Sequence, residues 1–542
     1  MEVVTLVLVL MLAVVVSGVI SRALPWPIPI PLVQIGFGAI ISIATQQGIE
    51  LNPEVFFLLF LPPLLFLDGW RIPREELLKD GSTVLELALG LVLFTVVGMG
   101  LFIHWMIPSM PLPVAFALAA VVSPTDPIAV SAIAQRVPIP KRLMHILEGE
   151  SLLNDASGLV CLRFAVAAAL TGTFSLYDAG LTFLWLALGG IAIGVGVTWA
   201  ITRVKDRISA RYGEDTGSQV LISLLIPFAA YLAAEHLHCS GILAAVSAGL
   251  TMSVVETTGR AMATTRIRRN AVWDMIQFAA NGTIFVLLGE QLPGILDRAR
   301  DTVVMTGHHE VWWLAIYVVA INAGLAALRF IWVWASFKLT IFRSSTPRTS
   351  PNWRIVAAMS FAGVRGAITL AGVLTLPFTT LDGGPFPARD LAIFLAMGVI
   401  IVSLVAASIG LPILLKDLEA PAEHGDRAQE DEARNAAAEA AVAEIDRVLH
   451  ALPEGRSDAP IYVAVADRIM DLYRRRVEGR SHLNEMDVSR GDYERIEREL
   501  YLAAVKAERS ELNRRVRARQ LNSETARKLV RELDLAEIRY SK

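Results

Sequence analysis

The chain has 542 residues, of which 54 % are hydrophobic and 19 % charged, and its formal net charge is −3. A soluble chain carries about 25 % charged residues, so the composition indicates a polytopic membrane protein in a lipid bilayer. The charged residues lie mainly in short loops and in the last ~120 residues, which leaves no basic stripe for binding nucleic acid. The two cysteines, Cys161 and Cys239, form neither a disulfide framework nor a metal motif.

Thirteen apolar segments approach the length of about 20 residues that a membrane-spanning helix needs. They centre on residues 3–20, 28–43, 53–68, 83–106, 112–134, 145–170, 181–201, 217–235, 239–255, 272–290, 311–337, 354–376 and 390–415. The segment at 239–255 is short, and Pro62-Pro63 breaks the segment at 53–68. The first segment has no basic stretch before it and is expected to be a retained span, not a cleaved signal peptide. The expected fold is an all-α polytopic membrane protein.

Basic residues alternate from loop to loop along the chain, so the positive-inside rule assigns an orientation. The basic loops are cytoplasmic, which predicts an N-terminus outside the plasma (inner) membrane and a C-terminus inside. Residues 1–415 form the expected transmembrane domain, and 416–542 form a cytoplasmic tail. Apolar residues at helical spacing predict amphipathic helices in this tail, with a partly disordered tail as the alternative. The tail is a candidate for binding a regulatory ligand or protein.

The fifth segment contains S-P-T-D-P at Ser123–Pro127. Proline lacks an amide donor and clashes with the preceding turn, so two prolines around Asp126 predict a broken helix. Unwound backbone at membrane depth is tolerated only where it lines a cavity or is buried in protein. Freed carbonyls, the Thr125 hydroxyl and the Asp126 carboxylate are hard oxygen donors suited to an alkali cation. The alternative is a proline kink in which Asp126 caps a half-helix, and the two roles are compatible.

The sixth segment begins with E-G-E-S-L-L-N-D-A-S at Glu148–Ser157. A carboxylate inside a membrane span costs roughly 2.5–3.5 kcal/mol, so it indicates a functional site. Helical spacing places Ser151 and Asp155 on one face, with Glu150 and Asn154 on the neighbouring face. Together with Asp126, Asp155 predicts an ion site at mid-membrane depth. If Glu150 is buried it needs a cation, either Arg329 of the eleventh segment or Arg365 of the twelfth.

The twelfth segment contains F-A-G-V-R-G-A at Phe361–Ala367, where two glycines flank Arg365 and allow a second break. The fifth and twelfth segments are seven apart, and an odd shift reverses orientation. Segments 1–6 and 8–13 are therefore expected to be inverted repeats, and interrupted helices at matching positions mark a transporter site. Asp68 ends the third segment as an interfacial cap or as part of the cytoplasmic mouth. Arg163, inside the sixth segment, has no assigned role.

Four motifs carry a resemblance to a known family. They are P-P-L-L-F-L-D-G at 62–69, S-P-T-D-P at 123–127, E-G-E-S-L-L-N-D-A at 148–156 and G-V-R-G-A at 363–367. In this order they resemble the cation/proton antiporters, in the bacterial sodium/proton antiporter branch akin to animal sodium/hydrogen exchangers. The resemblance covers roughly residues 50–415 and implies a thirteen-span inverted-repeat fold, two crossing discontinuous helices and a homodimer.

The resemblance also implies roles for the acidic cluster. By position, Asp155 is the ion- and proton-binding carboxylate, and Asn154 replaces the second aspartate of electrogenic relatives. Ser151, Thr125 and Asp126 help to form or shape the site, so that Asp155, Ser151 and Thr125 are the expected sodium ligands. The sodium ion and the proton are the transported cargo, and no cofactor is expected.

Three further positions carry over from the family pattern. Asp68 matches an acidic position near the cytoplasmic funnel, and Arg365 matches the arginine of the twelfth-segment break. Glu150 matches a structural glutamate paired with an arginine of the eleventh segment, here Arg329. One carboxylate binds either one proton or one sodium ion, which implies electroneutral 1:1 exchange. The expected cellular role is pH and sodium homeostasis.

Three rival functions compete with sodium/proton exchange. Potassium/proton exchange, or exchange of several monovalent cations, would use nearly the same residues. An intramembrane aspartyl protease with Asp126 and Asp155 as its dyad is disfavoured, because neither lies in a Y-D or G-x-G-D motif. A channel or pH sensor would lack saturable exchange against a gradient.

Overall fold

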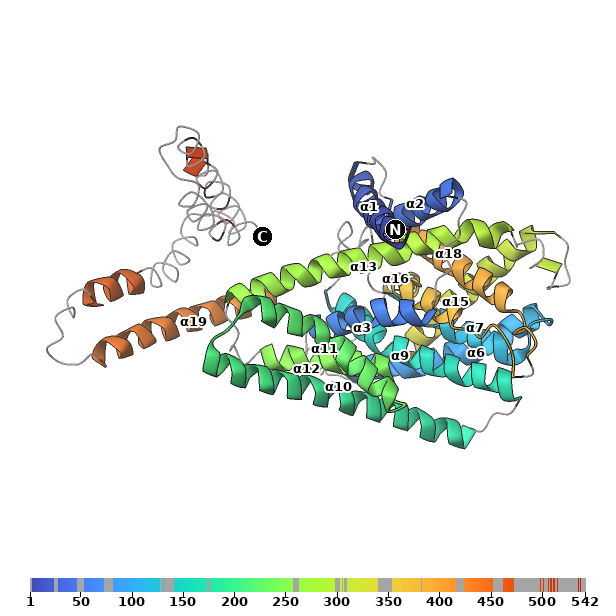
Figure 1. Cartoon of the computed structure of the whole chain (residues 1–542), viewed down its shortest axis with the longest axis horizontal. Coiled ribbons are helices and arrows are strands. Elements are labelled where there is room, and N and C mark those ends of the chain that lie inside the picture. Colours follow the sequence, from blue (N-terminus) through green and yellow to red (C-terminus); the bar gives the residue numbers. More distant parts are fainter. Residues whose placement is uncertain are drawn as a thin grey trace. The chain divides into compact units, whose positions relative to one another are not determined.

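The computed structural model describes most of the chain. It covers residues 2–23, 28–45, 53–72, 81–126, 130, 141–172, 176–256, 263–297, 303–304, 306, 310–339, 353–381, 383–415, 424–451 and 462–471, with single positions between 498 and 537. Over these residues the fold is helical, as predicted, and the one β contact is an isolated bridge between Thr379 and Pro385 (Figure 1). The chain divides into two compact units, 1–420 and 421–542.

The first unit is built from helices that follow one another along the chain. They are α1 Glu2–Ala23, α2 Ile30–Thr45, α3 Pro53–Arg71, α5 Gly81–Leu85, the π-helix η1 Glu86–Leu91, α6 Val92–Met106, α7 Leu112–Val122, α9 Lys141–Thr171, α10 Leu176–Tyr212, α11 Thr216–His236, α12 Gly241–Glu256, α13 Ala263–Asp297, α15 Trp312–Leu339, α16 Trp353–Phe361, α17 Ala367–Leu374 and α18 Arg389–Leu415. The second unit contains α19, His424–His450, and a helix over 462–471.

In the described residues, each of the thirteen apolar segments is helical over part or most of its length. Among the described residues, seven helices are long and apolar enough to cross a membrane, and four further apolar helices are shorter. Thirteen therefore stays a prediction for the number of spans. In the tail, α19 is a helix in which Ala441, Ile445 and Leu449 are half-buried and Val448 is exposed, so an amphipathic helix stays a prediction.

The predicted break at Pro62-Pro63 is wrong. Helix α3 runs without interruption through both prolines, which are buried. Each proline removes one backbone hydrogen bond, but membrane helices tolerate this loss where neighbouring helices surround the freed carbonyl groups. The continuous helix carries Leu64 and Asp68 on consecutive turns.

The two other predicted breaks are present. Helix α7 ends at Val122 and is followed by non-helical backbone up to Asp126, and residues 127–129 lie outside the described part. Helix α16 ends at Phe361, and α17 begins at Ala367 after a non-helical link. These are the segments in which proline or glycine removes the local preference for a continuous helix.

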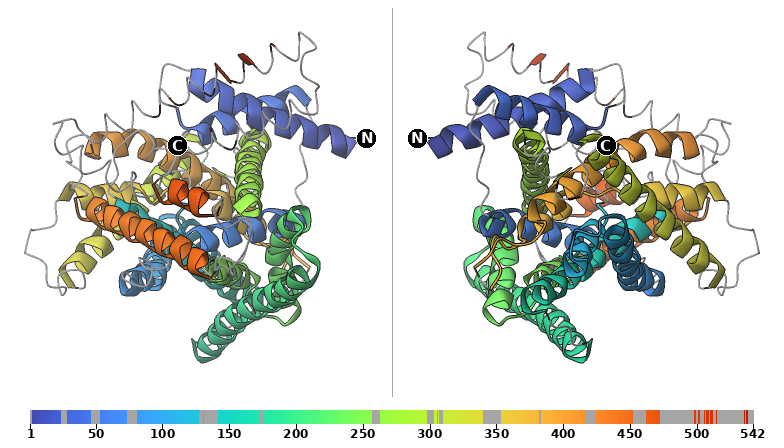
Figure 2. Two further views of the ribbon diagram at one scale, coloured as in Figure 1. Left: turned by 90° about the vertical axis from the view of Figure 1, so that its left-hand side faces the viewer. Right: turned by 90° about the vertical axis from the view of Figure 1, so that its right-hand side faces the viewer.

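The helices of the first unit pack as two bundles. The scaffold bundle consists of α1, α2, α3, α10, α11, α12 and α13, with α2 along α13, α3 along α12, and α10 beside α11 and α12 (Figures 1 and 2). The site bundle consists of α5, η1, α6, α7, α9 and α15 to α18, in which both broken segments lie. The bundles meet where α3 and α13 contact α17, where α3 and α12 contact α9, and where α2 and α13 contact α18.

Glycines bring the scaffold helices into backbone contact. A Cβ atom on Gly38 of α2 would overlap the backbone of Val286 in α13, and one on Gly289 of α13 would overlap Ile35 in α2. The crossing of α3 and α12 has the same construction, with Gly69 and Gly249 each against the other helix's backbone. Close backbone approach supplies the packing that holds helices together where no water drives them to associate.

We expect Gly289→Val to destabilise the scaffold bundle by about 1–3 kcal/mol, because the added side chain overpacks a backbone contact. The measurement is the midpoint of thermal unfolding in detergent. Gly196→Val on α10 is the matched control, since nothing lies within 4 Å of a Cβ atom there. Equal midpoints for the two variants would contradict a close crossing of α2 and α13.

Candidate ion-binding site

The two broken segments contact each other directly. The backbone N–H of Asp126, in the first break, donates to the carbonyl of Val364 in the second, at 2.7 Å. In return, Nε of Arg365 in the second break donates to the Val122 carbonyl at the end of α7, at 2.8 Å. The interrupted backbone of each segment is therefore partly satisfied by the other, as unwound backbone inside a membrane requires.

Two buried arginines cap the carbonyl ends of the interrupted helices. Arg365 donates to Val122 and also to the carbonyl of Gly363. Nε of Arg329, on α15, donates to the Met359 carbonyl near the end of α16, at 2.9 Å. Unsatisfied carbonyl groups give the C-terminal end of a helix a partial negative charge, so guanidinium groups are favourable there.

Asp126, in contrast to the two arginines, lies at the N-terminal end of a helix. Its carboxylate packs against Gly366, the residue that caps the N-terminus of α17, and a side chain at this glycine would collide with it. Free N–H groups give this end of a helix a partial positive charge that favours an anion. The position of Asp126 therefore fits the half-helix cap that the sequence offered as an alternative role.

Glu150 is paired with Arg329. The carboxylate accepts two hydrogen bonds from the guanidinium, at 2.5 and 2.7 Å, across 179 residues of sequence. Both side chains are buried, with 1 % and 3 % exposure. The bidentate pair compensates Glu150 and orients Arg329 toward α16. Of the two partners open from the sequence, the structure places Arg329 at Glu150.

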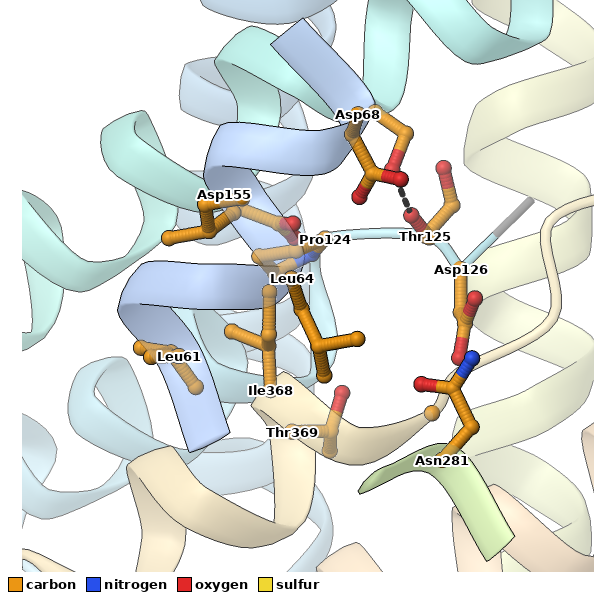
Figure 3. Close-up of a pocket in the computed structure, with 13 residues that line it drawn as sticks. Leu61, Leu64, Asp68, Pro124, Thr125, Asp126, Asp155, Asn281, Ile368 and Thr369 are labelled. Atoms are coloured by element: carbon orange, nitrogen blue, oxygen red, sulfur yellow. Dashed lines mark hydrogen bonds between the residues drawn. The ribbon is translucent and has the colours of Figure 1, made fainter. Parts of the chain in front are cut away.

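Thr125 joins the first break to α9. Its hydroxyl accepts a hydrogen bond from Nδ2 of Asn154 at 3.0 Å and donates to Glu150 at 3.5 Å. The hydroxyl of Ser151 donates to the Thr125 carbonyl at 2.8 Å, the dashed line in Figure 3. The Thr125 hydroxyl is thus hydrogen-bonded to Asn154 and Glu150. The Thr125 carbonyl oxygen is hydrogen-bonded to Ser151 instead.

A pocket opens where the crossing meets the scaffold bundle (Figure 3). It is lined by Leu61, Leu64, Leu65, Asp68, Pro124, Thr125, Asp126, Ser151, Asp155, Asn281, Gly366, Ile368 and Thr369. Five of the residues predicted for the site therefore line this pocket, namely Asp68, Thr125, Asp126, Ser151 and Asp155. Asn154, Glu150 and the two arginines are absent from this lining and form the network behind it.

Asp155 is buried in this pocket, with 6 % exposure, and no ion pair or hydrogen bond joins its side chain to another described residue. It lies within electrostatic range of Asp126 and Asp68. Carboxylates that share a poorly solvated site repel one another when ionised, so such a site favours uptake of a proton or a cation. Over the described residues no group of three His, Cys, Asp or Glu could hold a metal ion, so hydroxyl and carbonyl oxygens would have to complete a cation's ligands.

Asn281 and Thr369 line the pocket as well, although neither was predicted from the sequence. Asn281 is an amide in the middle of the apolar segment at 272–290, and a polar residue at that depth is the signal that could have identified it. Arg163, which had no assigned role, donates to Glu235 near the end of α11 at 3.1 Å. This ion pair joins the site bundle to the scaffold bundle.

The fold and the site together define a class of protein. Two interrupted apolar helices that cross at a buried carboxylate, beside a second bundle, are the construction of a secondary transporter. A profile of the family described as "Sodium/hydrogen exchanger, transmembrane" matches residues 7–417, so the chain belongs to this family of membrane transporters. The resemblance seen in the motifs is thereby confirmed.

Several known proteins are similar to this chain. "Uncharacterized Na(+)/H(+) exchanger YjcE" of Escherichia coli (strain K12) is 43 % identical over 546 residues, 99 % of this chain and 98 % of that one. "Sodium, potassium, lithium and rubidium/H(+) antiporter" of Bacillus pumilus (strain SAFR-032) is 38 % identical, over 100 % of this chain and 78 % of that one. The solved sodium proton antiporter MjNhaP1 of Methanocaldococcus jannaschii has the same fold, with a TM-score of 0.59, 18 % identity, and coverage of 77 % of this chain and 99 % of that one.

We expect Glu150→Gln and Arg329→Met each to destabilise the protein by about 3–5 kcal/mol, because each leaves a buried charge without its partner. The double variant should lose much less than the sum of the two, since neither charge remains. A double-mutant cycle on thermal unfolding in detergent measures this coupling. Glu444 and Arg447, an exposed pair on α19, serve as the control and should show no measurable coupling. Additive losses at Glu150 and Arg329 would contradict a coupled buried pair.

Proposed function

We propose that the protein exchanges sodium ions for protons across the plasma membrane. The observation that carries this proposal is the buried Asp155 carboxylate, which faces the pocket and has no cationic partner among the described residues. Two of its acidic neighbours are compensated in other ways: Glu150 by Arg329, and Asp126 by the amide end of α17. Asp155 is then the group that a proton or a cation neutralises.

Protons and sodium ions compete for the oxygens of Asp155. Desolvation disfavours the bare charged carboxylate, so the site crosses the membrane either protonated or with a cation bound. Ser151, the Thr125 carbonyl and Asp126 lie in the same pocket as candidate neighbours of the bound ion. Because the two cargoes exclude each other, the apparent KM for sodium rises as the pH falls.

One such carboxylate exchanges one sodium ion for one proton, so the proposed cycle moves no net charge. Asn154 supports this stoichiometry, because its amide stands beside Asp155 in sequence and carries no charge. Asn154 is absent from the pocket lining, and its Nδ2 group donates to the Thr125 hydroxyl. An exchange rate in proteoliposomes that changed strongly with membrane potential would contradict electroneutral 1:1 exchange.

A broader cation range is the second candidate function. The relative from Bacillus pumilus is named for exchange of sodium, potassium, lithium and rubidium, and it matches the whole of this chain. The candidate ligands in the pocket are hard oxygen atoms, which serve any of these cations. Relative rates with the four ions distinguish this candidate from sodium-selective exchange.

Access to Asp155 alternates, in this proposal, by movement of the site bundle against the scaffold bundle. Inverted repeats supply the two-sided symmetry that such a cycle needs. The paired glycine crossings support the repeats, because a shift of seven segments converts the crossing of α2 with α13 into that of α12 with α3. Backbone contacts between its helices keep the scaffold bundle in place while the site bundle moves.

The orientation of the protein and its partners are part of the same proposal. The N-terminus is outside, the tail from residue 416 is cytoplasmic, and the protein is a homodimer that serves pH and sodium homeostasis. The tail is a candidate for binding a regulatory ligand or protein. Gly190 and Gly194 form a G-x-x-x-G on α10, and they pack against the backbone of Ser240 and Ala244 in the same chain.

Asp155→Asn should abolish sodium-dependent proton movement in proteoliposomes, because an amide neither binds the transported proton nor neutralises a cation. The assay compares sodium, lithium, potassium and rubidium in the wild type and in the variant. Asp390→Asn, at a half-exposed carboxylate in the first turn of α18, is the matched control and should retain exchange. Exchange that survived in Asp155→Asn would move the site to Asp126 or Asp68 and end the single-carboxylate mechanism.

A link between Arg163 and Glu235 should stop exchange, because their ion pair joins the two bundles that move in the proposed cycle. The chain carries Arg163→Cys and Glu235→Cys in a background with Cys161→Ser and Cys239→Ser. A short bifunctional thiol reagent with a reducible bond links the two positions. Exchange should fall after linking and return after reduction, while the unlinked protein stays active. Full exchange in linked protein would exclude movement at this contact.

A further inference from the structure

Asn281 is a polar side chain that the scaffold bundle contributes to the pocket. Most of the pocket's polar residues, including Thr125, Asp126, Ser151 and Asp155, belong to the site bundle. The scaffold contributes Asp68 and Asn281 together with three leucines of α3. An amide inside an apolar span is costly unless its polar atoms find partners, so its presence here needs a reason.

Helix α13 holds Asn281 in a defined place. The next residue, Gly282, packs so closely on Val14 of α1 and Gln34 of α2 that a Cβ atom would overlap both. One turn further, Phe285 and Val286 are buried in the core. The backbone at Asn281 is therefore held by close packing against α1 and α2 of the scaffold bundle.

The amide faces the site. In Figure 3 its nitrogen points toward the Asp126 carboxylate and its oxygen points into the pocket. No hydrogen bond joins the Asn281 side chain to another residue in the described part of the chain. An amide nitrogen is a donor suited to a carboxylate, and an amide oxygen is a hard acceptor suited to an alkali cation. The amide nitrogen thus points toward a carboxylate acceptor, and the amide oxygen points into the pocket where a cation would be bound.

We propose that Asn281 is a cation-specificity residue of the transporter, whose amide oxygen is a ligand of the bound alkali cation. The inference rests on the proposed function. The nitrogen faces Asp126 and keeps that carboxylate directed toward the amide end of α17, so the oxygen stays turned to the ion. Because the ligand belongs to the scaffold, the ion has its complete set of oxygens only while the site bundle stands against α13. Movement of the bundle removes this oxygen and favours release.

The test measures cation-dependent proton exchange in proteoliposomes for Asn281→Ala, which deletes the oxygen, and for Asn281→Asp, which keeps an oxygen at that place. Losing one contact to a charged group raises the apparent KM for sodium about tenfold or more. The maximal rate should stay within about threefold, and the preference of sodium over potassium should change. Asn281→Asp should keep the sodium KM near the wild-type value and shift the pH profile, since it adds a titratable group beside Asp126.

Thr283→Val is the matched control on the same helix. Thr283 is buried, its hydroxyl has no partner among the described residues, and it lies outside the pocket lining. The control should leave KM and ion preference unchanged. A second readout is the sodium-dependent rise in the midpoint of thermal unfolding in detergent, which Asn281→Ala should reduce whether or not the variant transports.

The outcomes separate this inference from the function on which it rests. Wild-type protein without cation/proton exchange would overturn the proposed function. An active wild type together with an Asn281→Ala variant of unchanged KM and ion preference would overturn only the role of Asn281. A fall in the maximal rate of Asn281→Ala at constant KM, shared by Thr283→Val, would assign α13 a packing role and also overturn the inference.

Discussion

Backbone groups that have lost their helix partners inside a membrane are the constraint on which this structure depends. The breaks after Val122 and Phe361 expose carbonyl groups where water is scarce, and an unsatisfied carbonyl there costs several kcal/mol. Guanidinium groups of Arg365 and Arg329 satisfy these ends. Each arginine is itself a buried charge, and the charge of Arg329 is paired with that of Glu150 on α9.

The pairing leads from the backbone to the chemistry of the site. Arg329 is neutralised by Glu150, and Glu150 in turn accepts a hydrogen bond from Thr125, so α9, α15 and the first break are fixed together. Asp126 lies at the amide end of α17. Asp155 is left buried in the pocket without such a partner in the described residues, and a carboxylate in that situation takes up a proton or a cation.

The way the helices pack distinguishes the scaffold bundle from the site bundle. The scaffold helices cross at glycines in direct backbone contact, which leaves little freedom for sliding. The site bundle meets the scaffold bundle through α9, α17 and α18, and the pocket lies at that junction with oxygen atoms on both walls. Movement between the bundles would therefore change the number of oxygens around an ion, and the Arg163–Glu235 pair would break or form with it.

The sequence by itself determined where the apolar helices lie, where two of them break and which carboxylates stand at the breaks. These features are local. Proline lacks an N–H group and glycine lacks a Cβ atom, so each affects the helix in which it lies, and a membrane-spanning helix is specified by a run of about 20 apolar residues. Only the tertiary structure decided that α3 continues through Pro62-Pro63, that Glu150 pairs with Arg329 and not Arg365, and that the Thr125 hydroxyl faces this network. It also brought Asn281 to the pocket. Such partners come from helices far apart in sequence, and their choice depends on how helices cross, which residue spacing within one segment does not encode.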